Sequence, residues 1–234
     1  MINQYNQTIG DTLINYTTGK LPNVDQIKGQ YSTIEKLSCK KHGKDLYNVF
    51  GPQSNAKDFT YLPINQFDNY NDYMVCLKEF EMSTDPYYFA VIDKKTEAAI
   101  GIFSFLNIDP NNRSIEMGWV LYSEKLKQTR MATEAQFLAM NYVFEQLEYR
   151  RYQWKCDSHN SPSYRAAIRL GFTFEGTLRN AVVYKNRSRD SQFFSIIPEE
   201  WFAVKQMFTK WLDSKNFDDE GAQIASLKSF FSLI

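Results

Sequence analysis

The sequence predicts a single mixed α/β (α+β) domain whose sheet is mostly antiparallel and is flanked by helices. A chain of 234 residues, 43% hydrophobic and 16% aromatic, can bury one substantial core. Three apolar runs in the first half are separated only by short turns, which is typical of antiparallel hairpins. A helical segment between two later strand-like runs predicts a right-handed crossover and a parallel pair of strands.

The first third of the chain supplies an arm, one strand and two helices. Residues 1–29 are polar and interrupted by glycines, so we expect a loosely attached arm. Apolar alternation predicts a strand at 30–37, and helical spacing predicts helices at 41–50 and 68–82. A long connector with two prolines, 51–67, joins these helices.

Three successive strands are expected next, at 87–92, 98–105 and 114–122. The turn residues at 93–96 and 109–112 separate them, so that each strand pairs with the one before it.

The second half follows a different rhythm. Apolar residues at helical spacing predict a helix at 135–147, and a strand at 151–156 follows it. Another helix begins at Asn160-Ser161-Pro162, and Gly171 stands where a C-cap glycine would end it. The remaining expected elements are strands at 172–178 and 191–197, a proline-led helix at 198–211, and a tail helix at 222–233.

We therefore divide the chain into an N-terminal arm (1–29), a domain (30–213) and a C-terminal helical tail (214–234). The tail carries an apolar series that ends in Phe230, Phe231 and Leu233. Such a series predicts docking onto the domain or onto a partner, which leaves a homodimer open.

Charge and cysteine content exclude several classes of function. Lys plus Arg equals Asp plus Glu at 27 each, so no global field attracts nucleic acid or an anionic membrane. The opening residues lack the pattern of a secretory leader and no window is apolar enough to span a membrane, so we expect no export and no membrane-spanning segment. Three scattered cysteines predict reduced thiols in the cytoplasm, with the nucleus left open, and neither they nor His42 and His159 form a metal-site pattern.

The segment 116–135 is the strongest candidate for a site. A β-branched and aromatic run passes through a short polar elbow, 127–132, into an amphipathic helix. This arrangement presents unpaired backbone N–H groups and a positive dipole end, which together favour a phosphate. The alternative is an ordinary strand-to-helix turn with solvated cations.

Four motifs in this order carry a family resemblance: E-M-G-W, A-T-E-A, N-S-P-S-Y-R-A-A-I-R-L-G-F and F-E-G-T-L-R. The series resembles the GNAT superfamily of N-acetyltransferases, and within it the bacterial enzymes that acetylate the N-termini of ribosomal proteins. The resemblance covers roughly residues 30–211. It implies a GNAT-like sheet splayed between its fourth strand (116–122) and its fifth (151–156), with acetyl-CoA as cosubstrate in the opening.

The resemblance also implies which residues contact the cofactor. The elbow corresponds to the family's pyrophosphate loop, although Lys127 stands at its first position and Arg130 replaces the usual glycine. That arginine could add a charge-assisted contact to phosphate. The expected cofactor contacts are Val120, Leu121, Tyr122, Lys127, Gln128, Thr129, Arg130, Ala132, Thr133 and Asn160.

Catalytic roles follow from the same resemblance. Glu116 corresponds to a carboxylate that helps to deprotonate the amine; the alternative is a structural ion pair with Arg113 or Arg151. Ser163 corresponds to a hydroxyl that assists the departing thiolate; the alternative is a helix-entry serine. Trp119 either walls the acetyl pocket or packs in the core.

Three further features have open alternatives. Asn160 is expected to bind the cofactor, to cap the following helix, or both. Cys156 is expected to be buried packing rather than a covalent relay. The basic cluster of the last hairpin is expected to be a solvated edge rather than a site for a coenzyme phosphate or an acidic substrate. This cluster contains Arg179, Lys185, Arg187 and Arg189.

The predicted function is acetyl transfer from acetyl-CoA to a primary amine, by direct attack of the amine on the thioester. Amides freed by a backbone distortion near Val120 and Leu121 are expected to polarise the carbonyl. The acceptor is a protein N-terminus or a small amine, and no metal is needed. The alternative function is a catalytically inactive acyl-CoA-binding or scaffold module, since the loop has lost its glycine.

Overall fold

The computed structural model describes residues 1–231. Its strands are β1 (Gln26–Lys28), β2 (Ser32–Lys36), β3 (Tyr87–Asp93), β4 (Ala99–Asp109), β5 (Ser114–Tyr122), β6 (Arg151–Asp157), β7 (Thr173–Tyr184) and β8 (Arg187–Ile196). Its α-helices are α1 (Cys39–Phe50), α2 (Tyr70–Met82), α3 (Arg130–Asn141), α4 (Ser161–Arg169), α5 (Pro198–Trp211) and α6 (Leu227–Phe231). Short 3₁₀ turns occupy Ala56–Phe59 and Ser214–Asn216, and a π turn, Tyr142–Gln146, extends α3.

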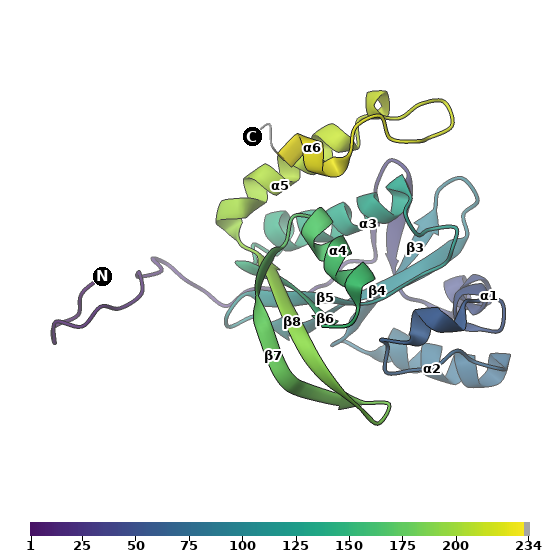
Figure 1. Cartoon of the computed structure of the whole chain (residues 1–234), viewed down its shortest axis with the longest axis horizontal. Helices are drawn as coiled ribbons and strands as arrows, with labels where there is room; N and C mark the ends of the chain where they lie inside the picture. The colour runs from purple at the N-terminus through teal and green to yellow at the C-terminus, as the bar shows by residue number, and fades with distance from the viewer. Residues whose placement is uncertain (232–234) are drawn as a thin grey trace.

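These strands form one sheet with the order β1-β2-β3-β4-β5-β6-β8-β7, and only β5 and β6 pair in parallel. The two faces of the sheet are covered by different helices (Figure 1). Side chains of α3, α4, α5 and α6 pack in the larger core cluster, and those of α1 and α2 in the smaller. The predicted fold class, a mixed and mostly antiparallel sheet flanked by helices, is confirmed.

The predicted order of elements holds along residues 30–213, with shifts at the ends. Helix α1 begins two residues before the expected 41–50, and α2 two residues after the expected start of 68–82. Gly171 has a φ of +94°, as expected for a glycine that ends a helix. Within the described part of the chain, no helix is long and apolar enough to cross a membrane.

The last hairpin is longer than the predicted strands at 172–178 and 191–197. Strands β7 and β8 continue to Tyr184 and Arg187 at the tip, because cross-strand pairing extends through a polar stretch that shows no apolar alternation. The irregularity between Leu178 and Val182 interrupts the period further. Figure 1 shows this hairpin extending beyond the rest of the sheet.

The predicted tail helix at 222–233 is wrong over residues 222–226. The Asn216 side chain donates a hydrogen bond to the Ala225 carbonyl and accepts one from the Ala225 N–H, so the backbone groups that a helix would use are engaged elsewhere. Helix α6 begins only at Leu227, which is buried in the larger core cluster. Leu233 lies outside the described residues.

The second half of the predicted arm contacts the domain. Residues Gln26–Lys28 form β1, a strand that was not predicted, and it pairs with β2. The strands expected to be the fourth and fifth are therefore β5 and β6. Further back, the Gly19 N–H bonds to the Pro110 carbonyl. The division at 29 and 213 stays a prediction.

Strands β5 and β6 pair only along part of their length. The parallel register runs from Ser114 opposite Arg151 to Met117 opposite Trp154. Beyond that pair the two strands separate: residues 118–122 of β5 have no partner on β6, and Gly118, Leu121 and Tyr122 pair with β4. This separation, which we call the strand split, is the splay expected between the fourth and fifth strands.

Candidate active site

A β-bulge on β5 lies within the strand split. Gly118 pairs with Ser104 and Leu121 with Ile102, so two residues, Trp119 and Val120, oppose one on β4. Trp119 has a φ of +51°, in the left-handed region that non-glycine residues rarely occupy. Such a bulge takes backbone groups out of the ladder.

The bulge lies earlier than expected. The distortion was predicted near Val120 and Leu121, but Leu121 has rejoined the ladder and its side chain is buried in the α1/α2 core. Any amide of this region that is available to a ligand therefore belongs to the bulge itself.

Trp119 and Tyr122 point toward opposite faces of the sheet. The Trp119 ring packs against Phe80 and Tyr88, with centroids 5.2 and 5.8 Å away, on the α1/α2 side. The Tyr122 hydroxyl accepts a hydrogen bond from Gln136 on α3, and burial raises the pKa of Tyr122 above its usual value. The core alternative for Trp119 accounts for its contacts.

The start of α3 lies directly after the elbow that was predicted to hold a pyrophosphate. Thr129 is the N-cap residue, and its hydroxyl oxygen accepts a hydrogen bond from the Ala132 N–H at 3.2 Å. Gln128 has a φ of +59°, which makes the sharp turn that glycine makes in the family pattern. The first two amides, of Arg130 and Met131, have no intrahelical acceptor.

The cationic side chains of the elbow are engaged by the protein. Lys127 Nζ lies 2.6 Å from Asp58 and 2.7 Å from Glu124. Burial opposes its charge, but these hydrogen bonds raise the pKa of Lys127 above its usual value. The Arg130 guanidinium stacks 4.1 Å above the Tyr31 ring, so the structure does not aim it at a phosphate. The N–H groups of α3 remain the natural anion donors.

One cation beside α3 was missed by the sequence reading. Arg169 at the end of α4 donates a hydrogen bond to the Thr133 hydroxyl at 2.8 Å, and Thr133 itself is buried. This contact joins the first turn of α3 to α4. Only a structure can show the pair, because 36 residues separate its members along the chain.

Glu116 is a buried carboxylate with two partners. It is 5% exposed. Its Oε2 accepts a hydrogen bond from Asn107 Nδ2 at 2.7 Å and lies 2.7 Å from Lys155 Nζ. The expected alternative of an ion pair is therefore correct in kind, but its partner is neither Arg113 nor Arg151.

The two arginines bind elsewhere. Arg113 donates to Thr17 in the arm, and Arg151 forms an ion pair with Glu175 on β7.

Asn160 and Ser163 stand together at the entry of α4. The Asn160 side-chain oxygen accepts a hydrogen bond from the Ser163 N–H at 3.2 Å, which confirms that Asn160 caps the helix. The Ser163 hydroxyl oxygen accepts a hydrogen bond from Trp154 Nε1 at 3.0 Å. Trp154 belongs to the last residue pair of β5 and β6 before the strand split. Ser163 therefore lies close to the point where the split begins.

Cys156 is buried packing, as expected. Its side chain belongs to the larger core cluster, and burial raises the pKa of the thiol above its usual value. A thiol with a raised pKa is a poor nucleophile near neutral pH, which argues against a covalent relay.

The end of β6 and the tip of the last hairpin form a polar network. The buried Asp157 carboxylate accepts hydrogen bonds from the Tyr184 hydroxyl at 2.9 Å and from the His159 N–H at 2.9 Å. Burial opposes its ionisation, but these hydrogen bonds lower the pKa of Asp157 below its usual value. The network fixes the hairpin tip next to the strand split.

The basic cluster of the hairpin is not simply a solvated edge. Lys185 Nζ donates to the Phe59 carbonyl at 2.7 Å, and Arg187 donates to the Thr60 carbonyl. The Tyr61 hydroxyl also donates to the His159 carbonyl at 2.9 Å. The connector between α1 and α2 is thereby joined to the β7–β8 tip. Arg179 and Arg187 are exposed, as expected for a solvated edge, whereas Lys185 and Arg189 are half-buried.

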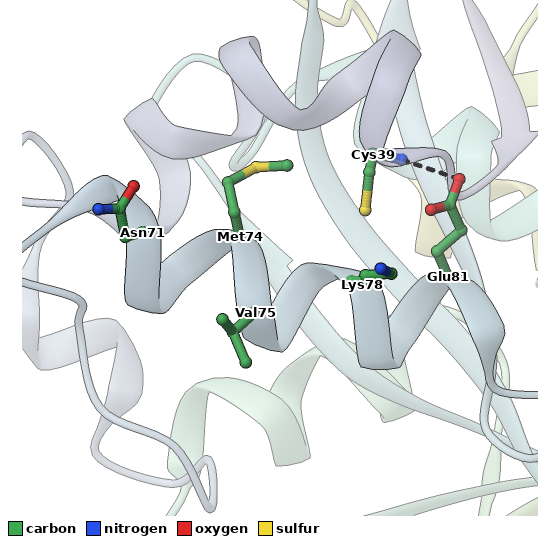
Figure 2. A pocket seen from close by; sticks show the side chains of 6 residues that line it. All are labelled: Cys39, Asn71, Met74, Val75, Lys78 and Glu81. Atoms are coloured by element: carbon green, nitrogen blue, oxygen red, sulfur yellow. Dashed lines mark hydrogen bonds between the residues drawn. The ribbon is translucent and has the colours of Figure 1, made fainter.

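A separate surface pocket lies between α1 and α2. Figure 2 shows that its lining includes Cys39 and Glu81 but none of the predicted site residues. The Cys39 N–H donates to Glu81 at 3.0 Å. Burial and the neighbouring carboxylate raise the pKa of the Cys39 thiol to about 12, so this cysteine is not an activated nucleophile.

Comparison with known proteins agrees with this geometry. The solved structure of a GCN5-related N-acetyltransferase from Brucella melitensis is 39% identical, with a TM-score of 0.92; the match covers 94% of this chain and 100% of that one. The ribosomal-protein-serine acetyltransferase of Escherichia coli is 31% identical over 103 residues, 44% of this chain and 57% of that protein. The microcin C7 self-immunity acetyltransferase MccE, solved with acetyl-CoA and AMP, shares the fold. It is 20% identical over 72% of this chain and 93% of that chain, with a TM-score of 0.64.

The family model of the acetyltransferase (GNAT) domain matches residues 44–173, more than half of the chain. This match includes the strand split, the bulge and the start of α3. The chain therefore belongs to the GNAT acetyltransferases and is an acyltransferase of that family.

Proposed function

We propose that this acetyltransferase moves the acetyl group of acetyl-CoA onto a primary amine by direct attack of the amine on the thioester. The observation that carries the proposal is the strand split: a buried carboxylate and a backbone bulge lie on β5 where β5 and β6 part, and the chain continues from β5 through a short turn into the start of α3. The presence of acetyl-CoA in the MccE structure, which has the same fold, supports acetyl-CoA as the donor.

Backbone amides provide the anion site for the coenzyme. The N–H groups of Arg130 and Met131 at the start of α3 bind the pyrophosphate, helped by the positive end of the helix dipole. The side chains of Lys127 and Arg130 support the loop instead, because Asp58 and Tyr31 hold them. Asn160 orients the pantetheine arm while it caps α4.

The bulge activates the acyl group. An N–H at Val120 donates to the thioester carbonyl and stabilises the negative charge that develops on the oxygen during attack. The protein holds this donor in place before the reaction begins, since Gly118 and Leu121 anchor the bulge on both sides.

Glu116 accepts a proton and Ser163 donates one during the reaction. Glu116, directly or through a water molecule, takes the proton that the attacking amine releases. The Ser163 oxygen accepts a hydrogen bond from Trp154, and its hydroxyl, which lies within hydrogen-bond reach of the Cys156 thiol, turns to donate its proton to the departing thiolate.

The acceptor is a peptide α-amine or a small primary amine. The E. coli relative is named a ribosomal-protein-serine acetyltransferase, which supports a peptide α-amine as one acceptor class.

The test is thiol release from acetyl-CoA, measured over a panel of peptides and small amines. We expect acceptor-dependent release, and we expect Glu116→Gln to lower kcat/KM at least about tenfold, roughly 1.4 kcal/mol in barrier. Glu175→Gln is the matched control, because it neutralises another carboxylate of the sheet that lies away from the split. Unchanged rates for Glu116→Gln would remove Glu116 from the mechanism. Coenzyme binding without turnover on any amine would favour the inactive acyl-CoA-binding module instead.

A further inference from the structure

Only one oxygen of the Glu116 carboxylate is held by the protein. Oε2 receives both the amide of Asn107 and the ammonium of Lys155, each at 2.7 Å. Within residues 1–231, no hydrogen bond reaches Oε1. Oε1 is also not one of the fully buried atoms without a partner, so it remains accessible. The carboxylate is therefore fixed at one oxygen and open at the other.

Lys155 stands at the strand split itself. It is the first residue of β6 beyond the last pair with β5, Met117 opposite Trp154. Its neighbours Trp154 and Cys156 point into the larger core, so alternation places Lys155 on the other face of the sheet. Glu116 lies on that same face, because Met117 points into the larger core as well.

The Lys155 ammonium is enclosed on two sides. Glu116 lies against it, and the Phe193 ring centroid on β8 is 4.9 Å from Nζ. A carboxylate and an aromatic face are the two groups that best hold a desolvated ammonium. The Lys155 side chain is 23% exposed and that of Glu116 is 7% exposed, so solvent competes little for this contact.

Asn107 holds the same oxygen from the opposite strand. It lies in the register irregularity of β4 between Leu106 and Asp109, and its φ is +49°. Asparagine tolerates this left-handed conformation better than most residues. Glu116 is thus gripped between β4 and β6, the neighbours of its own strand.

We propose that Lys155 is a positioning residue for acetyl transfer. Its ammonium, seated between Glu116 and Phe193, holds Oε2 and turns Oε1 toward the amine of the acceptor. The inference rests on the proposed function, in which Glu116 takes the proton of that amine. Lys155 forms no bond to the substrate and acts only through Glu116.

The experiment compares Lys155→Met and Lys155→Arg in the acceptor-dependent thiol-release assay. We expect Lys155→Met to lower kcat at least about tenfold, while the KM for acetyl-CoA stays within about twofold, because the coenzyme amides lie on α3. Lys155→Arg keeps the cation and should restore kcat to within about threefold of the wild type.

The matched control is Arg151→Met. Arg151 lies on the same face of the same strand and also pairs with a glutamate, Glu175, away from the split. Its loss should change kcat less than about twofold. If Lys155→Met does not fold by circular dichroism, Lys155→Gln, which removes the charge but keeps a donor, takes its place with the same expected loss of kcat.

Two results would overturn the inference. One is a Lys155→Met enzyme with wild-type kcat. The other is an equal loss in Lys155→Met and Lys155→Arg with the KM for acetyl-CoA raised in parallel, which indicates a general structural role. Failure of the proposed function is separate: it appears as an inactive wild type or as a Glu116→Gln enzyme with full activity.

Discussion

Two buried glutamates border different parts of the sheet, and the protein uses them in opposite ways. Glu134 on α3 is 3% exposed, and both of its oxygens are occupied by the turn between β1 and β2. The turn's donors are the N–H groups of Gln30, Tyr31 and Ser32, between 2.6 and 2.8 Å away, and the Ser32 hydroxyl. Glu116 at the strand split is nearly as buried, but one of its oxygens is open.

The difference separates a structural carboxylate from a candidate base. Donors of the β1–β2 turn saturate Glu134, so it has no capacity left for a substrate and instead ties this turn to α3. Glu116 is held by side chains on a single oxygen and keeps acceptor capacity beside the bulge. Burial alone does not distinguish the two residues; the count of occupied oxygens does.

The largest expected effect belongs to Glu134. Glu134→Ala removes the acceptor of three backbone N–H groups and of the Ser32 hydroxyl. The two Ser32 donors are buried, and leaving a buried donor unsatisfied costs about 1–3 kcal/mol, so we expect the free energy of unfolding to fall by about 3 kcal/mol. Urea unfolding measures this loss. The control is Glu79→Ala at an exposed site on α2, which should cost less than about 0.5 kcal/mol. A small loss for Glu134→Ala would mean that the turn is not anchored through α3.

Gly29→Ala should give the next largest effect. A Cβ at Gly29 would lie 2.5 Å from the carboxyl carbon of Glu134, whose position the turn has fixed. We expect a destabilisation of about 2 kcal/mol from this overpacking. At Gly176 an added Cβ meets nothing within 4 Å, so Gly176→Ala is the matched control in the same thermal scan. Equal melting temperatures for the two variants would contradict a rigid Glu134 site.

Ser163→Ala tests the strand split, where Glu116 lies. We expect kcat to fall about fivefold, roughly 1 kcal/mol, because the thiolate loses a hydrogen-bond donor, while stability changes little. Ser161→Ala, at the exposed first residue of the same helix, should leave kcat unchanged. A loss of stability without a loss of kcat would reduce Ser163 to a helix-entry serine.

The smallest effect is expected at the hairpin tip and depends on pH. Tyr184→Phe removes one of the hydrogen bonds that lower the pKa of Asp157, at a cost of about 1 kcal/mol at neutral pH. Because the folded-state pKa is lowered, this contribution is present above about pH 4 and disappears as the pH falls further and the carboxylate takes a proton. Denaturant unfolding at pH 7 and pH 3 measures it. A cost that is the same at both pH values would contradict a charged Asp157.

Much of the frame could be predicted from periodicity. The strand Ser114–Tyr122, the parallel partner that begins at Arg151, and the helix that begins at Pro198 all follow from apolar spacing and turn residues. The tail helix failed because a tertiary contact, the Asn216 side chain on Ala225, competed with local propensity.

The partners of the site could not be predicted, because they depend on register. Lys155 reaches Glu116 only because the parallel pair ends at Met117, and Asn107 reaches it only through an irregularity in β4. The packing of Arg130 against aromatic rings could not be predicted for a related reason. Its stacking partners, Tyr31 and Phe217, are distant in sequence, so no local pattern indicates them.

The central claim is that acetyl-CoA lies in the strand split, and backbone amide NMR tests it most directly. We predict that acetyl-CoA shifts the amide signals of Val120, Arg130 and Met131, while the signals of Tyr31 and Ser32 beside Glu134 stay in place. Signals at the bulge and at the start of α3 that do not move at saturating acetyl-CoA would contradict the account.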